Sequence, residues 1–413
     1  MNNIPKGYEQ TEVGVIPEDW EVKNIGEQID LLTGFPFPSS GYSQSGVKLL
    51  RGSNIKRGVT DWSPDITQYW EEIHYDLKQY QLDNGDIVIA MDGSLVGRSF
   101  ARLTSSDLPA LLLQRVARVR SKKIDMGYLK EFICSDYFTK HCDSVKTVTA
   151  IPHISPDDIK CFKIPLPPTL AEQTAIASAL SDADALIQSM EKLIAKKRAI
   201  KQGAMQELLR IQKGWVVKKL GEILDSFQLG GNYPNSEARS NHPLIKMGNL
   251  SRGYIGLSKL EFINNDVFPS QKDRLYFGDV LFNTRNTLEL VGKVAIWKDE
   301  LPEAYFNSNI MRFNFKQSHV SSTFFINFML NTKGMIVKLR GMATGTTSVA
   351  AIYTRDLLKL NIPLPALTEQ NRISTILTDM DAEIAAVKTK LAKYKWVKQG
   401  MMQNLFSGRI RLT

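Results

Sequence analysis

The second half of this chain restates the first half, and this internal repeat constrains the fold more than any other feature of the sequence. Residues 20–27 recur as residues 215–222, at a shift of 195 positions. The tetrapeptide Ile-Pro-Leu-Pro at 164–167 returns at 362–365, where the shift has grown through small insertions. Because the repeat spans nearly all of the 413 residues, the sequence predicts two similar domains.

Each copy of the repeat has two unlike parts. The first part, of about 150 residues, contains short β-rich runs separated by Gly, Pro, Asn and Ser turns, which is typical of a compact mixed α/β domain. The second part begins after the Pro-rich stop and reads as one long helix, opened in the first copy by Thr169 and Glu172 in capping-box spacing. We therefore predict domains at 1–168 and 214–365 and long helices at 169–213 and 366–413.

Apolar residues in the two predicted helices alternate steps of three and four, which is the 3.5-residue period of a coiled-coil seam. Positions in the second helix equal those in the first plus 197. The seam residues are Ile176, Leu180, Ala183, Ile187, Met190 and Ile194 in the first helix, and Leu377, Met380, Ile384, Val387 and Leu391 in the second.

Two matching seams in one chain favour pairing with each other. The first helix leads from one domain to the next, so an antiparallel second helix would return the chain, giving an intramolecular coiled coil with a pseudo-two-fold repeat. At 1.5 Å per residue the first helix would be about 60 Å long. The alternative, in which each helix packs only on its own domain, explains neither the length nor the narrow seam.

Bulk properties narrow the class of protein. The formal net charge of +9 and the pI near 9.2 favour an anionic partner, although over so long a chain they are a weak pointer to nucleic acid. No apolar run approaches the roughly 18 residues that span a bilayer, so we expect a soluble, cytoplasmic protein. Cys134, Cys142 and Cys161 lack the paired spacing of a zinc site, and we expect reduced thiols and no metal.

Three strings in this order identify a resemblance. Residues 11–20, the Pro-Leu-Pro segments followed by Glu-Gln at 172–173 and 369–370, and residues 407–412 together resemble the specificity subunits of Type I restriction-modification systems. Residues 210–213 depart from the pattern, since they replace the Gly-bearing end that closes the second copy.

The resemblance implies a non-catalytic DNA reader. Each domain, a target-recognition domain, would read one half of a split, asymmetric site in double-stranded DNA, and the helices would serve as spacer and docking surface for two methylation subunits, which restriction subunits would join. S-adenosylmethionine, ATP and Mg²⁺ would be bound by those partners, with no cofactor in this chain. The helix length limits the unread gap to fewer than about 18 base pairs.

Corresponding segments of the two copies carry side chains suited to phosphates and base edges. They form a basic turn, a Gly-containing hairpin and a hydroxyl-rich loop in each copy. An ordinary surface turn, a structural hairpin and a plain connector are the alternative interpretations. The candidate DNA contacts are Arg51, Asn54, Lys56, Arg57, Arg98, Thr147, Thr149 and His153 in the first copy, and Lys246, Asn249, Arg252, Lys293, Thr346, Thr347 and Ser348 in the second.

Competing functions can be weighed on the same residues. A methyltransferase with its own readers is disfavoured, since the one Pro-Pro pair, at 167–168, follows Leu166 and not the Asn or Asp of an adenine-methylating motif, and no suitable Gly-rich loop is found. A reader serving a methylase-nuclease fusion would look the same in sequence. A coiled-coil scaffold that bridges two proteins without touching DNA is the third possibility.

Overall fold

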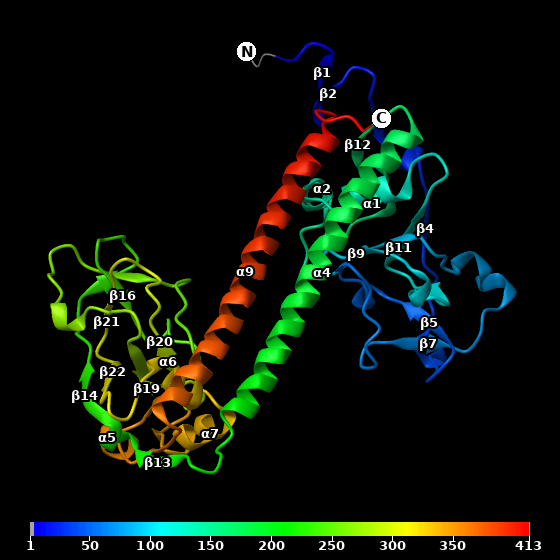
Figure 1. The fold of residues 1–413 in the computed structure, drawn as a ribbon. Helices are drawn as coiled ribbons and strands as arrows, with labels where there is room; N and C mark the ends of the chain where they lie inside the picture. The colour runs from blue at the N-terminus through cyan, green and yellow to red at the C-terminus, as the bar shows by residue number, and fades with distance from the viewer. Residues whose placement is uncertain (1–3, 413) are drawn as a thin grey trace. The chain divides into compact units, whose positions relative to one another are not determined.

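A computed structural model describes residues 4–412 and divides the chain into two compact units. Unit 1 comprises the residues up to Met190 together with those from Lys390 onward, and unit 2 comprises Glu191–Thr389. Each unit therefore contains one β-rich half of the sequence repeat and a part of both long helices (Figure 1).

Unit 1 is built on a five-stranded sheet in the order β4-β11-β8-β9-β6, beside a three-stranded sheet in the order β10-β5-β7. Two antiparallel pairs, β1 with β2 and β3 with β12, lie near the termini. The strands are β1 (Tyr8–Thr11), β2 (Gly14–Pro17), β3 (Glu21–Asn24), β4 (Asp30–Thr33), β5 (Val47–Leu50), β6 (Arg57–Gly58), β7 (Gln68–Trp70), β8 (Ile87–Ala90), β9 (Phe100–Arg102), β10 (Ala110–Leu112), β11 (Val116–Arg120) and β12 (Lys163–Leu166). The helices are α1 (Met126–Ile133), α2 (Asp136–Val145) and α3 (Pro156–Lys160).

Unit 2 repeats this plan. Its sheet β14-β22-β18-β20 corresponds strand for strand to β4-β11-β8-β9, and its parallel pair β16-β21 corresponds to β5-β10. The strands are β13 (Val216–Lys219), β14 (Leu224–Leu229), β15 (Asn235–Ser236), β16 (Pro243–Ile245), β17 (Glu261–Ile263), β18 (Val280–Asn283), β19 (Arg285–Asn286), β20 (Val294–Ile296), β21 (Tyr305–Phe306), β22 (Ile310–Phe315), β23 (Thr344–Gly345), β24 (Ala350–Ala351) and β25 (Asn361–Leu364). The helices are α5 (Leu220–Ile223), α6 (Thr323–Leu330), α7 (Lys333–Gly341) and α8 (Thr354–Leu357).

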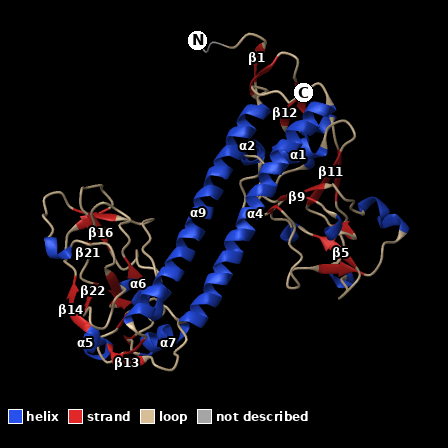
Figure 2. Cartoon of the chain, in the orientation of Figure 1, coloured by secondary structure: helices blue, strands red, loops and turns tan. Residues whose placement is uncertain are grey.

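The hydrophobic core of each unit is built on an apolar central strand, β8 in unit 1 and β18 in unit 2. All four residues of β8, and all four of β18, are buried. A strand covered on both faces reads as a continuous apolar run rather than an alternating one, which is why these strands are the clearest in the sequence. Figure 2 shows the same division of secondary structure in both units, with short strands in the globular part and the long helices against it.

The long helices are α4 (Leu170–Leu208) and α9 (Leu367–Phe406). They run antiparallel in each unit. In unit 1 Lys398 contacts Asp184, and Arg411, just after α9, contacts Glu172 near the start of α4. In unit 2 Lys197 contacts Glu383 and Lys201 contacts Asp381. The structure confirms the predicted mixed α/β class with two long paired helices. Every predicted seam residue is buried or half-buried, while most neighbouring positions are exposed.

The glutamine of the repeated Glu-Gln pair anchors each long helix to the β-rich domain that precedes it in the sequence. Gln173 accepts a hydrogen bond from the Asp125 amide at 2.9 Å and donates to the Pro167 carbonyl at 3.1 Å. Gln370 does the same with the Ser321 amide and the Pro365 carbonyl. Both glutamines are buried, so the motif is explained by the need to pair these backbone groups.

The start of α4 differs from the predicted capping box. Thr169 does cap the helix, since its hydroxyl accepts from the Glu172 amide at 3.2 Å. The Glu172 carboxylate, however, pairs with Arg411 at 2.5 Å instead of returning to the cap. Because Arg411 also binds Asp19, it ties the C-terminal segment to both the N-terminal region and the helix start.

Within residues 4–412, no helix combines the length and the apolar content that a membrane span requires.

Candidate nucleic-acid interface

The basic turn of each copy follows β5 in unit 1 and β16 in unit 2, and lies beside β9 or β20 of the main sheet. In unit 1 the Lys56 carbonyl accepts a hydrogen bond from the Phe100 amide at 3.2 Å. In unit 2 the Gly253 amide donates to the Val294 carbonyl at 2.7 Å. Gly58 and Gly253 both have a positive φ, 84° and 90°, which explains the glycine at the end of each turn.

A hairpin, residues 92–98 in unit 1 and 287–293 in unit 2, links the basic turn to the hydroxyl-rich loop in each unit. In unit 1 the Gly93 amide donates to the Pro152 carbonyl at 3.0 Å, and Asp92 pairs with His153. In unit 2 the Leu288 amide donates to the Thr347 carbonyl at 3.1 Å. Three segments that the sequence singled out separately are thus brought together around one hairpin in each unit.

Asn54 and Asn249 were predicted to contact DNA, and the structure gives them another role. Each is buried, with its side-chain oxygen accepting from the backbone three residues earlier, at Arg51 and Lys246. The Asn54 amide donates to the Asp61 carbonyl, and that of Asn249 to the Gly256 carbonyl, at 3.0 Å each. Burial and these bonds give both amides the role of holding the turn, and DNA contact by either residue stays a prediction.

Several of the predicted cations are already paired. Arg51 donates to the Ile66 carbonyl and is half-buried, and Lys246 lies 2.8 Å from Glu261. Lys56 bonds the Ser53 carbonyl at 2.9 Å and lies 3.7 Å from Asp61. These side chains stabilise the turn itself, so their availability to a ligand is reduced.

The hairpin arginine of unit 1 is held by a bidentate ion pair. The Arg98 guanidinium donates to both carboxylate oxygens of Asp143, at 3.1 and 2.7 Å. Hydrogen bonds from Arg98 and Lys146 lower the pKa of Asp143 to about 2. Arg57 likewise lies 3.2 Å from Asp136. In unit 2, Lys293 is half-buried and Arg252 donates to the Gly292 carbonyl at 3.5 Å.

The hydroxyl-rich loops are exposed, and their hydroxyls shape the backbone. Thr147 accepts from the His153 amide at 3.0 Å, and Thr149 donates to the Ile151 carbonyl at 2.7 Å. In unit 2 the hydroxyls of Thr346 and Ser348 lie 3.2 Å apart, while Thr347 is exposed. Loops of this kind leave backbone amides open to an approaching anion.

One basic residue at this interface was missed by the sequence reasoning. Arg340, on α7, donates to the Glu289 carbonyl of the unit 2 hairpin at 3.3 Å and is exposed. It lines a hollow of about 710 Å³ together with Thr287, Leu288, Glu289, Gly341 and Thr347. The sequence did contain a signal for Arg340: it corresponds to Asp143 at the same shift of 197 residues that relates the two helix seams.

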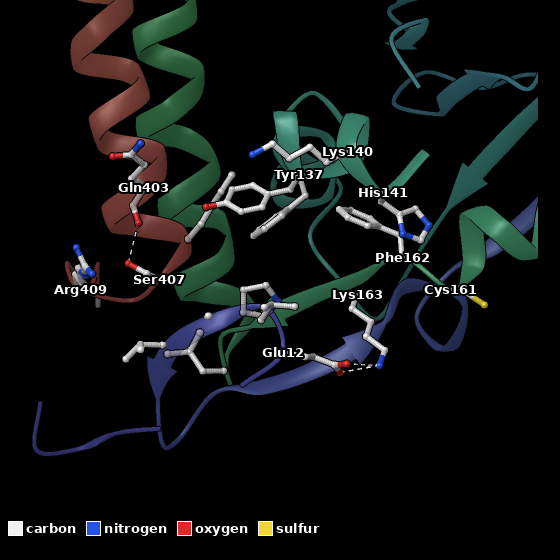
Figure 3. A pocket seen from close by; sticks show the side chains of 17 residues that line it. Glu12, Tyr137, Lys140, His141, Cys161, Phe162, Lys163, Gln403, Ser407 and Arg409 are labelled. Atoms are coloured by element: carbon white, nitrogen blue, oxygen red, sulfur yellow. Dashed lines mark hydrogen bonds and ion pairs between the residues drawn. The ribbon is translucent and has the colours of Figure 1, made fainter. Parts of the chain in front are cut away.

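A second cavity, of about 710 Å³, lies in unit 1 and contains none of the predicted contacts (Figure 3). It is bordered by β2 and the turn that precedes it, by Tyr137 and Lys140 of α2, and by the end of α9. The Phe132 and Phe406 rings stack in its wall with centroids 3.8 Å apart, and Lys163 and Glu12, which also line it, form an ion pair. Among residues 4–412, no three His, Cys, Asp or Glu side chains are grouped so as to hold a metal ion.

Comparison with known proteins bears directly on this repeated arrangement. The family described as the Type I restriction modification DNA specificity domain matches residues 17–197 and again residues 212–395, one match for each copy of the repeat. The chain belongs to this family.

A specificity-subunit relative illustrates the match. The MjaVIII specificity subunit of a Type I restriction enzyme from Methanocaldococcus jannaschii is 35% identical over 191 residues, which are 45% of this chain. The aligned part is 44% of that relative, so this match spans less than half of its length.

Two solved structures share the specificity-subunit fold. The S subunit of a Type I restriction-modification system from M. genitalium has a TM-score of 0.60 at 17% identity, over 94% of this chain and 96% of that one. A chain solved in work on complex assembly and conformational transition of the type I R-M system has a TM-score of 0.53 at 16% identity, over 96% and 99%.

Proposed function

We propose that this chain is the sequence-reading subunit of a Type I restriction-modification complex. Each unit reads one half of a split target in double-stranded DNA, and the two halves differ because the two domains differ outside their common framework. The helices α4 and α9 set the number of bases between the halves that are not read. The chain itself catalyses no reaction.

The observation that carries this proposal is the repeated convergence of turn, hairpin and loop, one set in each unit matched by the specificity-domain family. Such a set offers cations, hydroxyls and open backbone amides on a rigid support, which is what contact with a DNA backbone and base edges requires. A two-domain reader naturally recognises a bipartite site.

The partners follow from the same proposal. Two methylation subunits dock on the helices, and restriction subunits join the complex; the fold match to a chain studied for complex assembly of such a system supports this. S-adenosylmethionine, ATP and Mg²⁺ belong to those subunits, and the complex works in the cytoplasm where its DNA lies.

The salt dependence of binding tests the proposal against a protein scaffold. The chain, assembled with its methylation subunits, is titrated with duplex DNA at 50 and 200 mM salt. A reader that contacts six or more phosphates loses roughly a thousandfold in affinity between these conditions. Absence of salt-dependent DNA binding by the assembled complex would instead support the scaffold.

A further inference from the structure

The helix that flanks the hairpin carries opposite charges in the two units. At the shift of 197 residues, Asp136 and Asp143 of α2 correspond to Lys333 and Arg340 of α7. The structure supports this alignment. A Cβ added to the hairpin glycine would lie 2.5 Å from the Cys142 Cβ in unit 1, and 3.4 Å from the corresponding Leu339 Cβ in unit 2.

In unit 1 the two acids of α2 neutralise the arginines of this face. Asp136 lies 3.2 Å from Arg57, and Asp143 binds Arg98 through both oxygens. An exposed guanidinium in a bidentate pair has its donors already directed at a carboxylate. A DNA phosphate could engage these arginines only by displacing Asp136 and Asp143, which would repel it.

In unit 2 the α7 positions that correspond to Asp136 and Asp143 are basic, and the exposed Glu289 is the acid that lines the hollow beside Arg340. Arg252 and Arg340 donate to backbone carbonyls of the same hairpin, at Gly292 and Glu289. Among the described residues, neither guanidinium forms an ion pair with a carboxylate. Lys333, at the start of α7, is exposed. Burial and the charge of Arg340 both lower the pKa of Arg252, as expected for two like charges held close together.

The shape of this face suits an anion. The hollow beside Arg340 offers the exposed Thr347 and the backbone of Gly341. Glu289 also lines it, with its carbonyl accepting from Arg340. Each guanidinium presents its N–H donors in a fixed planar arrangement that suits an oxyanion. The nearby loop lacks bulky side chains, so a phosphate can approach its backbone closely.

We propose that unit 2 is the electrostatic anchor of this chain on DNA. Arg252 and Arg340 hold a backbone phosphate of duplex DNA against the hairpin at 287–293, whereas the repeat-related face of unit 1 holds none because Asp136 and Asp143 occupy its arginines. This inference rests on the proposed DNA-reading function and adds a division of labour between the units.

Salt titrations of the complete chain with its methylation subunits test the anchor. The slope of log affinity against log salt is measured for target duplexes by fluorescence anisotropy. Arg340→Gln is the main variant because its side chain is exposed and its loss does not threaten folding. Losing one phosphate contact should lower the slope by about 0.9 and weaken binding about tenfold. Lys359→Ala, an exposed lysine of unit 2 paired with Asp356, is the matched control.

The reverse change tests the other half of the proposal. Asp143→Arg places the unit 2 residue in unit 1 and frees Arg98, so the slope should become steeper by about one contact. Unchanged slopes in both variants, with normal DNA binding by the parent, would overturn the anchor and leave the DNA reader intact. If the parent complex itself shows no salt-dependent DNA binding, the proposed function fails first.

Discussion

Asn54 and Asn249 show how a residue type suited to DNA can serve the fold instead. Both amides lie beneath the basic turns, where each pairs a backbone amide and a backbone carbonyl. The sequence pattern correctly marked the turns as repeated features. Which of their polar side chains point inward depends on the three-dimensional path of the turn, which residue type alone does not determine.

Replacing Asn249 should destabilise unit 2 rather than weaken a base contact. Asn249→Ala leaves buried backbone groups unpaired at Lys246 and Gly256, at a cost of about 1–3 kcal/mol in the free energy of unfolding. Urea unfolding followed by circular dichroism measures this loss. Asn241→Ala, at an exposed position of the same unit, should change the free energy by less than about 0.5 kcal/mol.

The three thiols should differ sharply in reactivity. Burial raises the pKa of Cys134 and of Cys142 to about 12, so at pH 8 only about one thiol in ten thousand is ionised, whereas Cys161 is exposed. A thiol-specific chromogenic reagent should therefore label one cysteine per native chain and three in denaturant. Cys161→Ser should abolish the rapid native reaction; rapid labelling of that variant would contradict the raised pKa of the other two thiols.

The long helices α4 and α9 could be predicted from the sequence, whereas the contacts that attach them to the globular domains could not. A 3.5-residue period is a local pattern, so α4 and α9 and their seam could be derived from the sequence. The contacts of Gln173 and Gln370 with loops about 50 residues away required the fold. The neutralisation of Arg98 by Asp143 was missed for the same reason, because α2 brings together residues 45 positions apart.

Two repeat-related ion pairs join α4 and α9 beside the helix seam. Lys201 of α4 lies 2.5 Å from Asp381 of α9 in unit 2, and Lys398 of α9 lies 2.7 Å from Asp184 of α4 in unit 1. Lys201 also lies over the Phe328 ring at 5.1 Å. Polar pairs at seam positions can select one register and direction of pairing, since a shifted register would leave their charges unpaired.

Exchanging the charges of one seam pair should reveal this role. Lys201→Asp or Asp381→Lys alone places like charges together and should destabilise unit 2 by about 1–3 kcal/mol. The double exchange should recover a large part of that loss in urea unfolding. Arg198→Asp, at an exposed position of α4, controls for the change in helix charge. Purely additive effects would mean that the pair does not couple the helices.

The architecture of the whole chain follows from its repeat. Two copies of about equal length predicted two domains of one plan, and β4-β11-β8-β9 and β14-β22-β18-β20 have the same strand order. The positions at which the two copies differ indicate how the two units differ from each other. The reversed charge at positions 143 and 340 is not visible in either copy alone; it has meaning because each residue lies beside the corresponding hairpin of its own unit.

Lengthening α4 should change the target without changing what either unit reads. Four residues inserted after Met190 add about 6 Å of helix, which exceeds the roughly 3.4 Å rise of one base pair. We expect the unread gap to grow by at least one base pair, with both half-sites unchanged. A four-residue insertion in the exposed loop after Glu237 should leave the gap as it is; an unchanged gap in the α4 variant would exclude the helix as the spacer.

The most direct test of the central claim is to express the chain with its methylation subunits and to map methylated adenines across the host genome by single-molecule sequencing. The account predicts a split, asymmetric motif that appears only when this chain is present. No new methylation, with the complex shown to be assembled and supplied with S-adenosylmethionine, would contradict the assignment of this chain as the reader.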